Sequence, residues 1–408
     1  MTAAHSPPEQ PATEPCARRV FVHIGGYYPL APEVNQRRFQ REYERSLKTW
    51  ALDGAFGPRT DGPDWSTWTI RTQGKGWSSE VEHILFRWED IIEADRDHGW
   101  LSRVGLGLLT FADFALNGAM SGYFRHAWRY AGFFLYPFVL LGLIYGAALW
   151  ISRRAMQLVG FAPDWLVASG LAILLFFALL HVIGAPLKLD HLLDDWNYGR
   201  RIVRDGDPAV EERLSRLADR LNDEPREVLI VGHSFGAVWG AALIAMMVAR
   251  RPEGAPVRFA SVGASILKIG FNAAARPLRL ALAAIAAAPR VIWHDFTALN
   301  DVMNFHMVEP LAALGIAGRP PHVRKVRFRA MVAPEYYARM ERNFFRLHNQ
   351  FISGNDARAS YDYFMLMCAP WPMEAQSLSP EGVIPWVDAA GGLTEQGRRI
   401  AFTEDAAP

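Results

Sequence analysis

The chain has 408 residues, half of them hydrophobic, and can bury the core of one large domain or two ordinary ones. Its 43 basic and 42 acidic residues give a net charge of +1, which argues against a polybasic, nucleic-acid-binding surface. Two cysteines, Cys16 and Cys368, are too few for a disulfide scaffold and lack metal-site spacing.

The first part of the chain predicts a short lead followed by strands and a helix. Residues 1–18 are polar and rich in proline, and we expect a disordered lead without a secretory signal, because they have no apolar core segment. Residues 19–28 (RVFVHIGGYY) predict a buried strand that ends in a glycine pair. An amphipathic helix is expected over residues 35–52, and two further strands are expected over residues 66–72 and 80–88.

Two long apolar segments interrupt this soluble pattern. Residues 131–150 contain no charged side chain, and His181 is the single ionisable group of residues 165–187. Each segment is long enough to cross about 30 Å of hydrocarbon as a helix, which makes a pair of buried core helices the weaker interpretation. Because the link between them is short, we predict a transmembrane hairpin over residues 130–188. Aromatic residues typical of the membrane boundary stand near its ends: Trp128, Tyr130, Trp150 and Trp165.

The flanks of the hairpin bear on its orientation. Basic residues are more frequent outside the hairpin (Arg125, Arg129, Lys188, Arg200, Arg201) than in its link (Arg153, Arg154). This bias favours an integral protein of the cell membrane whose body lies on the cytoplasmic side. A further apolar stretch, residues 104–120, precedes the hairpin and is interrupted by Asp113; it fits either a core helix or a helix lying in the membrane interface.

After the hairpin, helix and strand patterns alternate, as in proteins with a parallel sheet. Helices are expected over residues 207–222, 235–250 and 273–289, and strands over residues 226–231, 257–263, 290–296 and 323–332. The sequence therefore predicts an α/β fold with a mostly parallel central sheet, interrupted by the transmembrane hairpin. The folded domain would comprise residues 19–129 and 189–370, followed by a C-terminal tail over residues 371–408.

Ser234 lies at the centre of the string GHSFG, which has the Gly-x-Ser-x-Gly pattern. A Gly-x-Ser-x-Gly string alone is a weak signal, because short motifs arise by chance. Here it follows the predicted strand EVLIV and opens a helix, which is the context of a nucleophile elbow. Such a sharp turn leaves no room for side chains at its flanking positions, and Gly232 and Gly236 have none. We therefore predict that Ser234 is a nucleophile.

The segment VGHSFGAVWGA, followed by an acidic residue after a later strand and a histidine near the end, resembles the α/β-hydrolase superfamily. The resemblance covers most of the chain outside the hairpin and the two ends, and it implies a triad in the order Ser, acid, His. Asp301 lies in the loop where the acid is expected, with Asp295 as the alternative. His348 is the expected base, because His306 is too close to Asp301 and His322 precedes a strand at the opposite edge of the sheet.

The same resemblance implies an oxyanion hole. The backbone N–H of Phe235 is one expected donor, and Gly26, with Gly25 as the alternative, is the other. His23 stands near the usual His-Gly position of the family, although an isoleucine intervenes. Residues 191–196 (HLLDDW) invite a metal interpretation but have no partner cluster, and no nucleotide-binding loop is present. We predict no cofactor and no metal.

These observations predict a membrane-anchored serine hydrolase that cleaves a lipid or other apolar acyl ester through an acyl-enzyme. The alternatives are an acyltransferase that uses the same triad, and an inactive membrane-tethered binding or scaffold protein with the same fold. The expected partners are the bilayer and an apolar ester. The hairpin precedes the elbow strand, so it either brings the active-site mouth to the bilayer as an entry route or serves only as an anchor.

Overall fold

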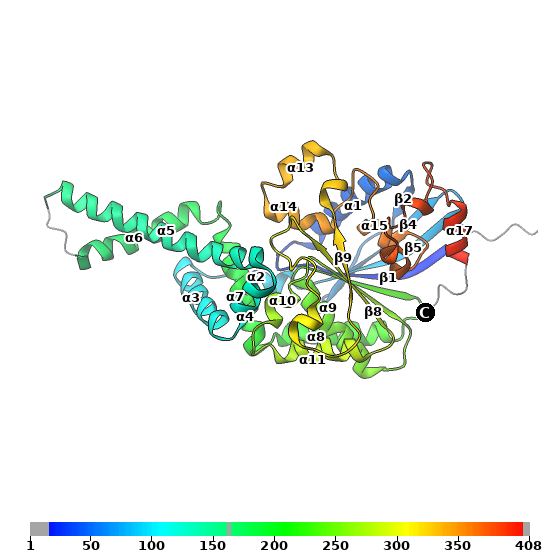
Figure 1. The fold of residues 1–408 in the computed structure, drawn as a ribbon, viewed down its shortest axis with the longest axis horizontal. Coiled ribbons are helices and arrows are strands. Elements are labelled where there is room, and N and C mark those ends of the chain that lie inside the picture. Colours follow the sequence, from blue (N-terminus) through cyan, green and yellow to red (C-terminus); the bar gives the residue numbers. More distant parts are fainter. Residues whose placement is uncertain (1–15, 161–164, 403–408) are drawn as a thin grey trace, which may run out of the picture.

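The computed structural model describes residues 16–160 and 165–402, and a nine-stranded sheet forms its centre (Figure 1). The strand order is β2-β4-β5-β1-β6-β7-β8-β9, with β3 paired to β4. The six neighbours from β5 to β9 run parallel, whereas β4 is antiparallel to both β5 and β2. The strands are β1 (Cys16–Ile24), β2 (Asp53–Phe56), β3 (Thr60–Asp61), β4 (Trp65–Gly74), β5 (Trp77–Phe86), β6 (Glu227–His233), β7 (Val257–Val262), β8 (Val291–Ala298) and β9 (His322–Val326).

Helices cover both faces of the sheet, because its central strands alternate apolar side chains between two cores. In β1, Val20 and Val22 belong to one core and Phe21 to the other. The first core is closed by α2 (Glu89–Arg96), α7 (Leu189–Asp205), α8 (Pro208–Asn222), α9 (Gly236–Arg250) and α11 (Arg276–Ala287). The second is closed by α1 (Pro32–Trp50), α13 (Pro334–Met340) and α15 (Tyr363–Cys368). The predicted α/β architecture with a mostly parallel sheet is thus confirmed.

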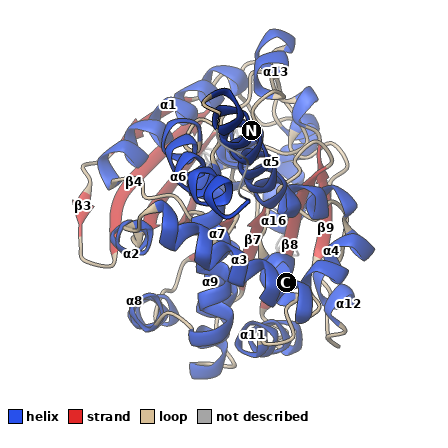
Figure 2. Ribbon diagram, turned by 90° about the vertical axis from the view of Figure 1, so that its left-hand side faces the viewer, coloured by secondary structure: helices blue, strands red, loops and turns tan. Residues whose placement is uncertain are grey.

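Two apolar helices, α5 (Trp128–Leu158) and α6 (Trp165–Ile183), pack together and project from the body (Figure 1). Both are long and apolar enough to cross a membrane, with mean hydropathies of 2.0 and 2.6. In Figure 2 they stand in front of the body, facing the viewer. The first turns of α5 belong to the core, where the ring of Tyr130 lies 4.1 Å from that of Phe305. The pair is therefore fixed to the body at its base. Part of the predicted link, residues 161–164, lies outside the described residues.

The ambiguous apolar stretch before the hairpin folds as α3 (Trp100–Leu116), followed by α4 (Ala119–His126). One face of α3 packs on α7, where Arg103 donates to Asp194 at 2.6 Å. On the same face Thr110 donates to Asn197 at 2.8 Å. The other face exposes four leucines: Leu101, Leu108, Leu109 and Leu116. This helix thus buries one side against the body and exposes apolar side chains on the other.

The structure corrects the predicted boundaries at both ends of the domain. Residues 16–18 belong to β1, while residues 1–15 of the predicted lead lie outside the described residues. The predicted tail is folded as far as residue 402, because Trp371 and Trp386 are buried in a small core with Trp50 and Trp77. This segment consists of short elements, the longest an eight-residue helix over Glu395–Phe402, and its tryptophans are buried through contacts far away in the chain.

Smaller elements complete the fold. The strand predicted over residues 323–332 ends at Val326, and β2 and β3 were not predicted. The remaining helices are α10 (Ile266–Gly270), α12 (Pro310–Leu314), α14 (Phe344–His348), α16 (Met373–Leu378) and α17 (Glu395–Phe402). Three 3-10 turns span Phe328–Ala330, Asn349–Ile352 and Ile384–Trp386.

Candidate active site

Ser234 occupies a sharp turn between β6 and α9. Its backbone is left-handed, with φ at +56°, a conformation that non-glycine residues adopt rarely and that is found mainly at functional sites. A Cβ on Gly232 would lie 2.5 Å from the Ala237 Cα, and one on Gly236 would lie 2.0 Å from the Ile24 carbonyl oxygen. Both glycines are therefore required for the turn to form as observed.

The predicted site residues gather at one edge of the sheet. Gly26 follows β1, Ser234 follows β6 and Asp301 follows β8, so all three lie beyond the carboxyl ends of parallel strands. Ligands of open α/β sheets bind at this edge. His348 ends the short helix α14, which returns to the same place after β9.

His348 and Asp301 form a buried pair. Their Nδ1 and Oδ2 atoms are 2.7 Å apart, and the two residues are 3% and 2% exposed. The other oxygen of Asp301 accepts the backbone N–H of Met303 at 2.9 Å. Because an ionised carboxylate only accepts hydrogen bonds, Nδ1 is the donor and Nε2 is the basic nitrogen. Within the described residues Nε2 is buried and has no hydrogen-bond partner, the Ser234 hydroxyl included.

The alternative acid, Asp295, lies elsewhere. It points from β8 to the hydroxyl of Ser261, which also accepts the indole N–H of Trp293 at 2.8 Å. Burial raises the pKa of Asp295 to about 7. The structure thus brings Asp301, and not Asp295, to His348.

The other two histidines that follow Asp301 in the chain do not pair with it. His322 begins β9 and lies at the amino end of that strand, where its ring is 4.9 Å from that of His294. His306 lies beside Thr297 at the end of β8. Of the three candidate bases, His348 alone contacts the predicted acid.

Gly26 approaches the nucleophile closely. A Cβ on Gly26 would lie 3.0 Å from the Ser234 Cβ and 3.4 Å from its Oγ. A Cβ on Gly25 would instead make only an ordinary contact with the His23 ring, at 3.8 Å. The backbone N–H groups of Gly26 and Phe235 donate to no other described residue. One of these unpaired donors, the Phe235 N–H, directly follows the candidate nucleophile at the amino end of α9.

Three contacts that the sequence did not suggest shape the site. Gly263 follows β7 with φ at +55°, and a Cβ there would lie 2.8 Å from the His348 ring. Two hydrogen bonds fix the backbone of Ser234: its N–H donates to the Val262 carbonyl oxygen, and its own carbonyl oxygen accepts the Ser265 N–H. Gly263 is visible in the sequence as a glycine after a strand. Its contact with His348 joins residues far apart in the chain and has no local signal.

His233 packs beside the pair without joining it, and His23 lines the same cavity. The ring of His233 lies 4.7 Å from that of His348, and its Nε2 is 3.4 Å from the His348 carbonyl oxygen. Burial lowers the pKa of His233 well below its usual value, and burial together with Arg38 lowers the pKa of His23 to about 4. Both rings are therefore neutral near pH 7.

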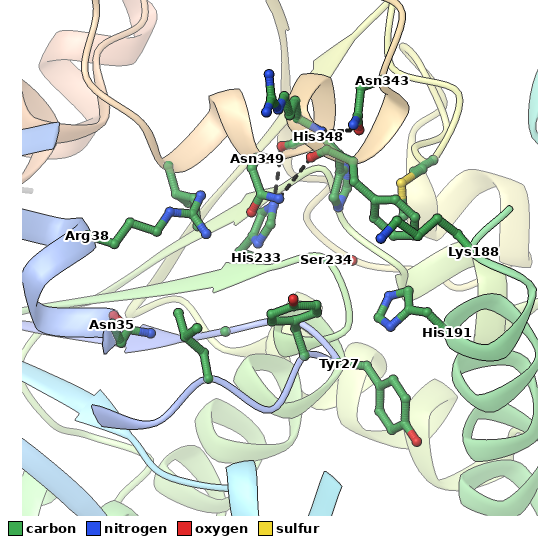
Figure 3. A pocket seen from close by; sticks show the side chains of 18 of the residues that line it. Tyr27, Asn35, Arg38, Lys188, His191, His233, Ser234, Asn343, His348 and Asn349 are labelled. Carbon is green, nitrogen blue, oxygen red and sulfur yellow. Dashed lines mark hydrogen bonds between the residues drawn. The ribbon is translucent and has the colours of Figure 1, made fainter. Parts of the chain in front are cut away.

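A cavity of about 450 Å³ opens beside Ser234 and His348. It reaches Ala185 and Lys188, which follow α6 at the base of the hairpin. Figure 3 shows Arg38 reaching in from one side of Ser234, with Lys188 and His191 on the opposite side. The candidate nucleophile therefore lies between α1 and the base of the two apolar helices.

The polar cluster at residues 191–196 is occupied by contacts within the protein. Its side chains pair as His191 with Arg96, Asp194 with Arg103, and Asp195 with Lys268. Over residues 16–160 and 165–402 no group of three or more His, Cys, Asp or Glu side chains is arranged to hold a metal ion.

Comparisons of the chain with models of protein families, with curated proteins and with solved structures gave no match.

Proposed function

We propose that this protein is a membrane-anchored serine hydrolase of the α/β-hydrolase type that cleaves an apolar acyl ester. The observation that carries the proposal is the buried pair of His348 and Asp301 beside Ser234, which sits on a strained turn. Asp301 fixes the tautomer that leaves Nε2 of His348 free to accept a proton. Within the described residues Nε2 of His348 has no hydrogen-bond partner, so it is available to take that proton.

The proposed reaction follows from these positions. Nε2 of His348 takes the proton of Ser234 as Oγ attacks the ester carbonyl, and the N–H groups of Gly26 and Phe235 stabilise the oxyanion. The carbonyl–alkoxy bond then breaks and His348 returns the proton to the departing alcohol. Water, deprotonated by the same histidine, releases the acid and restores the serine. The hydrogen bond from Ser234 to His348 is open in the free protein and would close with substrate, as is common in unliganded active sites.

The proposal includes insertion of α5 and α6 in a membrane, with the body on the cytoplasmic side. Support comes from the length and hydropathy of the two helices and from the exposed leucines of α3 beside them. The cavity reaches Ala185 and Lys188 at the hairpin base, so an ester from the lipid phase would have a short path to Ser234. This position favours the hairpin and α3 as an entry route rather than as an anchor alone.

Hydrolysis of two esters by the purified full-length protein tests this proposal. The wild type should cleave 4-nitrophenyl butyrate in solution and 1-oleoylglycerol in vesicles, and Ser234→Ala should cleave neither. Replacing Leu108 and Leu109 by Gln should slow the vesicle substrate more than the soluble one. Leu280→Gln on α11 is the control and should change neither rate; this leucine is 71% exposed, against 56% for Leu108 and Leu109. A folded wild type without esterase activity would refute the hydrolase, and equal losses on both substrates would refute the entry route.

A further inference from the structure

The cavity beside Ser234 extends toward both the hairpin base and α1. The end at the hairpin base is mixed in character: it is lined by Tyr28, Ala185 and Phe345 together with Lys188, Asp190 and His191. The other end is polar and is lined by Asn35 and Arg38 of α1 together with Arg346 and Asn349. Ser234 lies between the two ends (Figure 3). A molecule that filled the cavity would therefore extend from its reacting carbonyl toward the hairpin base on one side and toward Arg38 and Arg346 on the other.

The polar end holds positive charge that the protein does not neutralise. Neither Arg38 nor Arg346 forms an ion pair with a carboxylate of the described residues. The one acidic residue among those lining the cavity is Asp190, and its ion pair is with Arg96. Burial lowers the pKa of Arg38, yet a guanidinium stays charged at any physiological pH. Arg38 is half-buried and Arg346 is exposed, so both guanidinium groups are accessible to an anion that enters the cavity.

A second hollow continues the polar end toward solvent. It shares Arg38, Arg346 and Asn349 with the cavity and is lined further by residues of α1. Two acidic residues line this hollow: Glu42 is engaged by Arg41 and Arg45, and Glu44 accepts a hydrogen bond from Gln40 at 3.1 Å. The two unpaired guanidinium groups thus stand where the cavity meets water, so a charged substituent bound there would keep part of its hydration.

We infer that the substrate is an acyl ester with an anionic group in its alcohol part, bound by Arg38 and Arg346. The inference rests on the proposed hydrolase function. Guanidinium groups bind phosphate and carboxylate through paired, charge-assisted hydrogen bonds. The acyl chain would lie toward the hairpin base and the anion toward α1. Hydrolysis would consume one water, release the fatty acid and leave the anionic alcohol, whose phosphate or carboxylate takes no part in bond breaking.

Binding to the Ser234→Ala protein tests this inference apart from catalysis. Calorimetry would compare 1-oleoylglycerol, its 3-phosphate and O-oleoyl lactate, which share the acyl chain and differ in the anion. We expect the phosphate or the lactate to bind at least ten times more tightly than the neutral ester, since a hydrogen bond to a charged group contributes about 1.5–3 kcal/mol. Tighter binding of the 3-phosphate would identify a phosphate as the bound anion, and tighter binding of the lactate ester would identify a carboxylate.

Arginine variants in the same Ser234→Ala background complete the test. Arg38→Gln and Arg346→Gln should each reduce the preference for the anionic ester about tenfold. Arg37→Gln, the neighbouring exposed arginine of α1, should leave it unchanged. Equal affinity for neutral and anionic esters, or a preference that survives both variants in folded protein, would overturn the inference. Hydrolysis of the same esters by the wild type is measured separately, so tight anion binding without turnover would refute the hydrolase and not the anion site.

Discussion

Replacement of Asp301 by Asn should inactivate the protein without unfolding it, for a reason that lies in its two hydrogen bonds. Oδ1 accepts from the Met303 N–H and Oδ2 accepts from His348 Nδ1. In the variant the amide oxygen would keep the Met303 bond, and the amide NH₂ would then face Nδ1. The imidazole must switch tautomer, so that Nε2 carries the proton and cannot accept one from Ser234. In the opposite orientation the amide NH₂ would face the Met303 N–H, so that two donors would meet. That orientation would be less stable by about 1–3 kcal/mol.

The expected loss of kcat is large because His348 would stay in place but could no longer accept the proton of Ser234. A wrong tautomer of this kind lowers kcat about 10⁴-fold in serine hydrolysis, equivalent to roughly 5.5 kcal/mol of transition-state stabilisation. The assay is kcat for 4-nitrophenyl butyrate, with thermal unfolding as the control for folding. Asp295→Asn is the matched variant and should retain activity within about tenfold. Asp301→Asn activity above one tenth of wild type, or a larger loss in Asp295→Asn, would refute the reasoning.

Three further predictions concern the backbone of the site and one buried acid. Gly26→Ala should lower kcat about 100-fold with little change in thermal midpoint, because its Cβ would lie 3.0 Å from that of Ser234, whereas Gly25→Ala should keep most activity. Gly236→Ala should destabilise the fold by about 3 kcal/mol or more, seen as loss of folded protein, because its Cβ would lie 2.0 Å from a β1 carbonyl oxygen. The raised pKa of Asp295, about 7, means that the folded protein retains a proton that the unfolded chain releases near pH 4. Stability should therefore fall as pH rises from about 4 to 7, by at most about 4 kcal/mol, and thermal melts of Asp295→Asn should lack this slope.

Local sequence patterns predicted the elements that carry the site. The run of apolar residues in β6, the two glycines around Ser234 and the apolar helix α9 are consecutive in the chain, and their spacing indicates the turn that the structure contains. The two apolar helices were equally visible, since their length and lack of charge are local properties. Chain order then led to His348 and Asp301, which the structure places in contact.

Long-range packing was beyond the reach of the sequence. The tail from residue 371 was misjudged because Trp371 and Trp386 are buried only through contacts with Trp50 and Trp77, far away in the chain. Arg38 lies within the amphipathic helix predicted over residues 35–52, and only the fold brings it to the cavity. The sequence also could not divide residues 104–120 into a core face and an exposed face, because α7, which covers one side, follows about 70 residues later.

The most direct test of the central claim is the reaction of membranes containing the full-length protein with a fluorophosphonate probe, followed by mapping of the modified peptide. An activated serine displaces fluoride and forms an Oγ–P bond, so the account predicts labelling at Ser234 in the wild type. Labelling should be absent in Ser234→Ala and at least 100-fold slower in His348→Ala. A folded wild type that stays unlabelled, or label on any residue other than Ser234, would contradict the account.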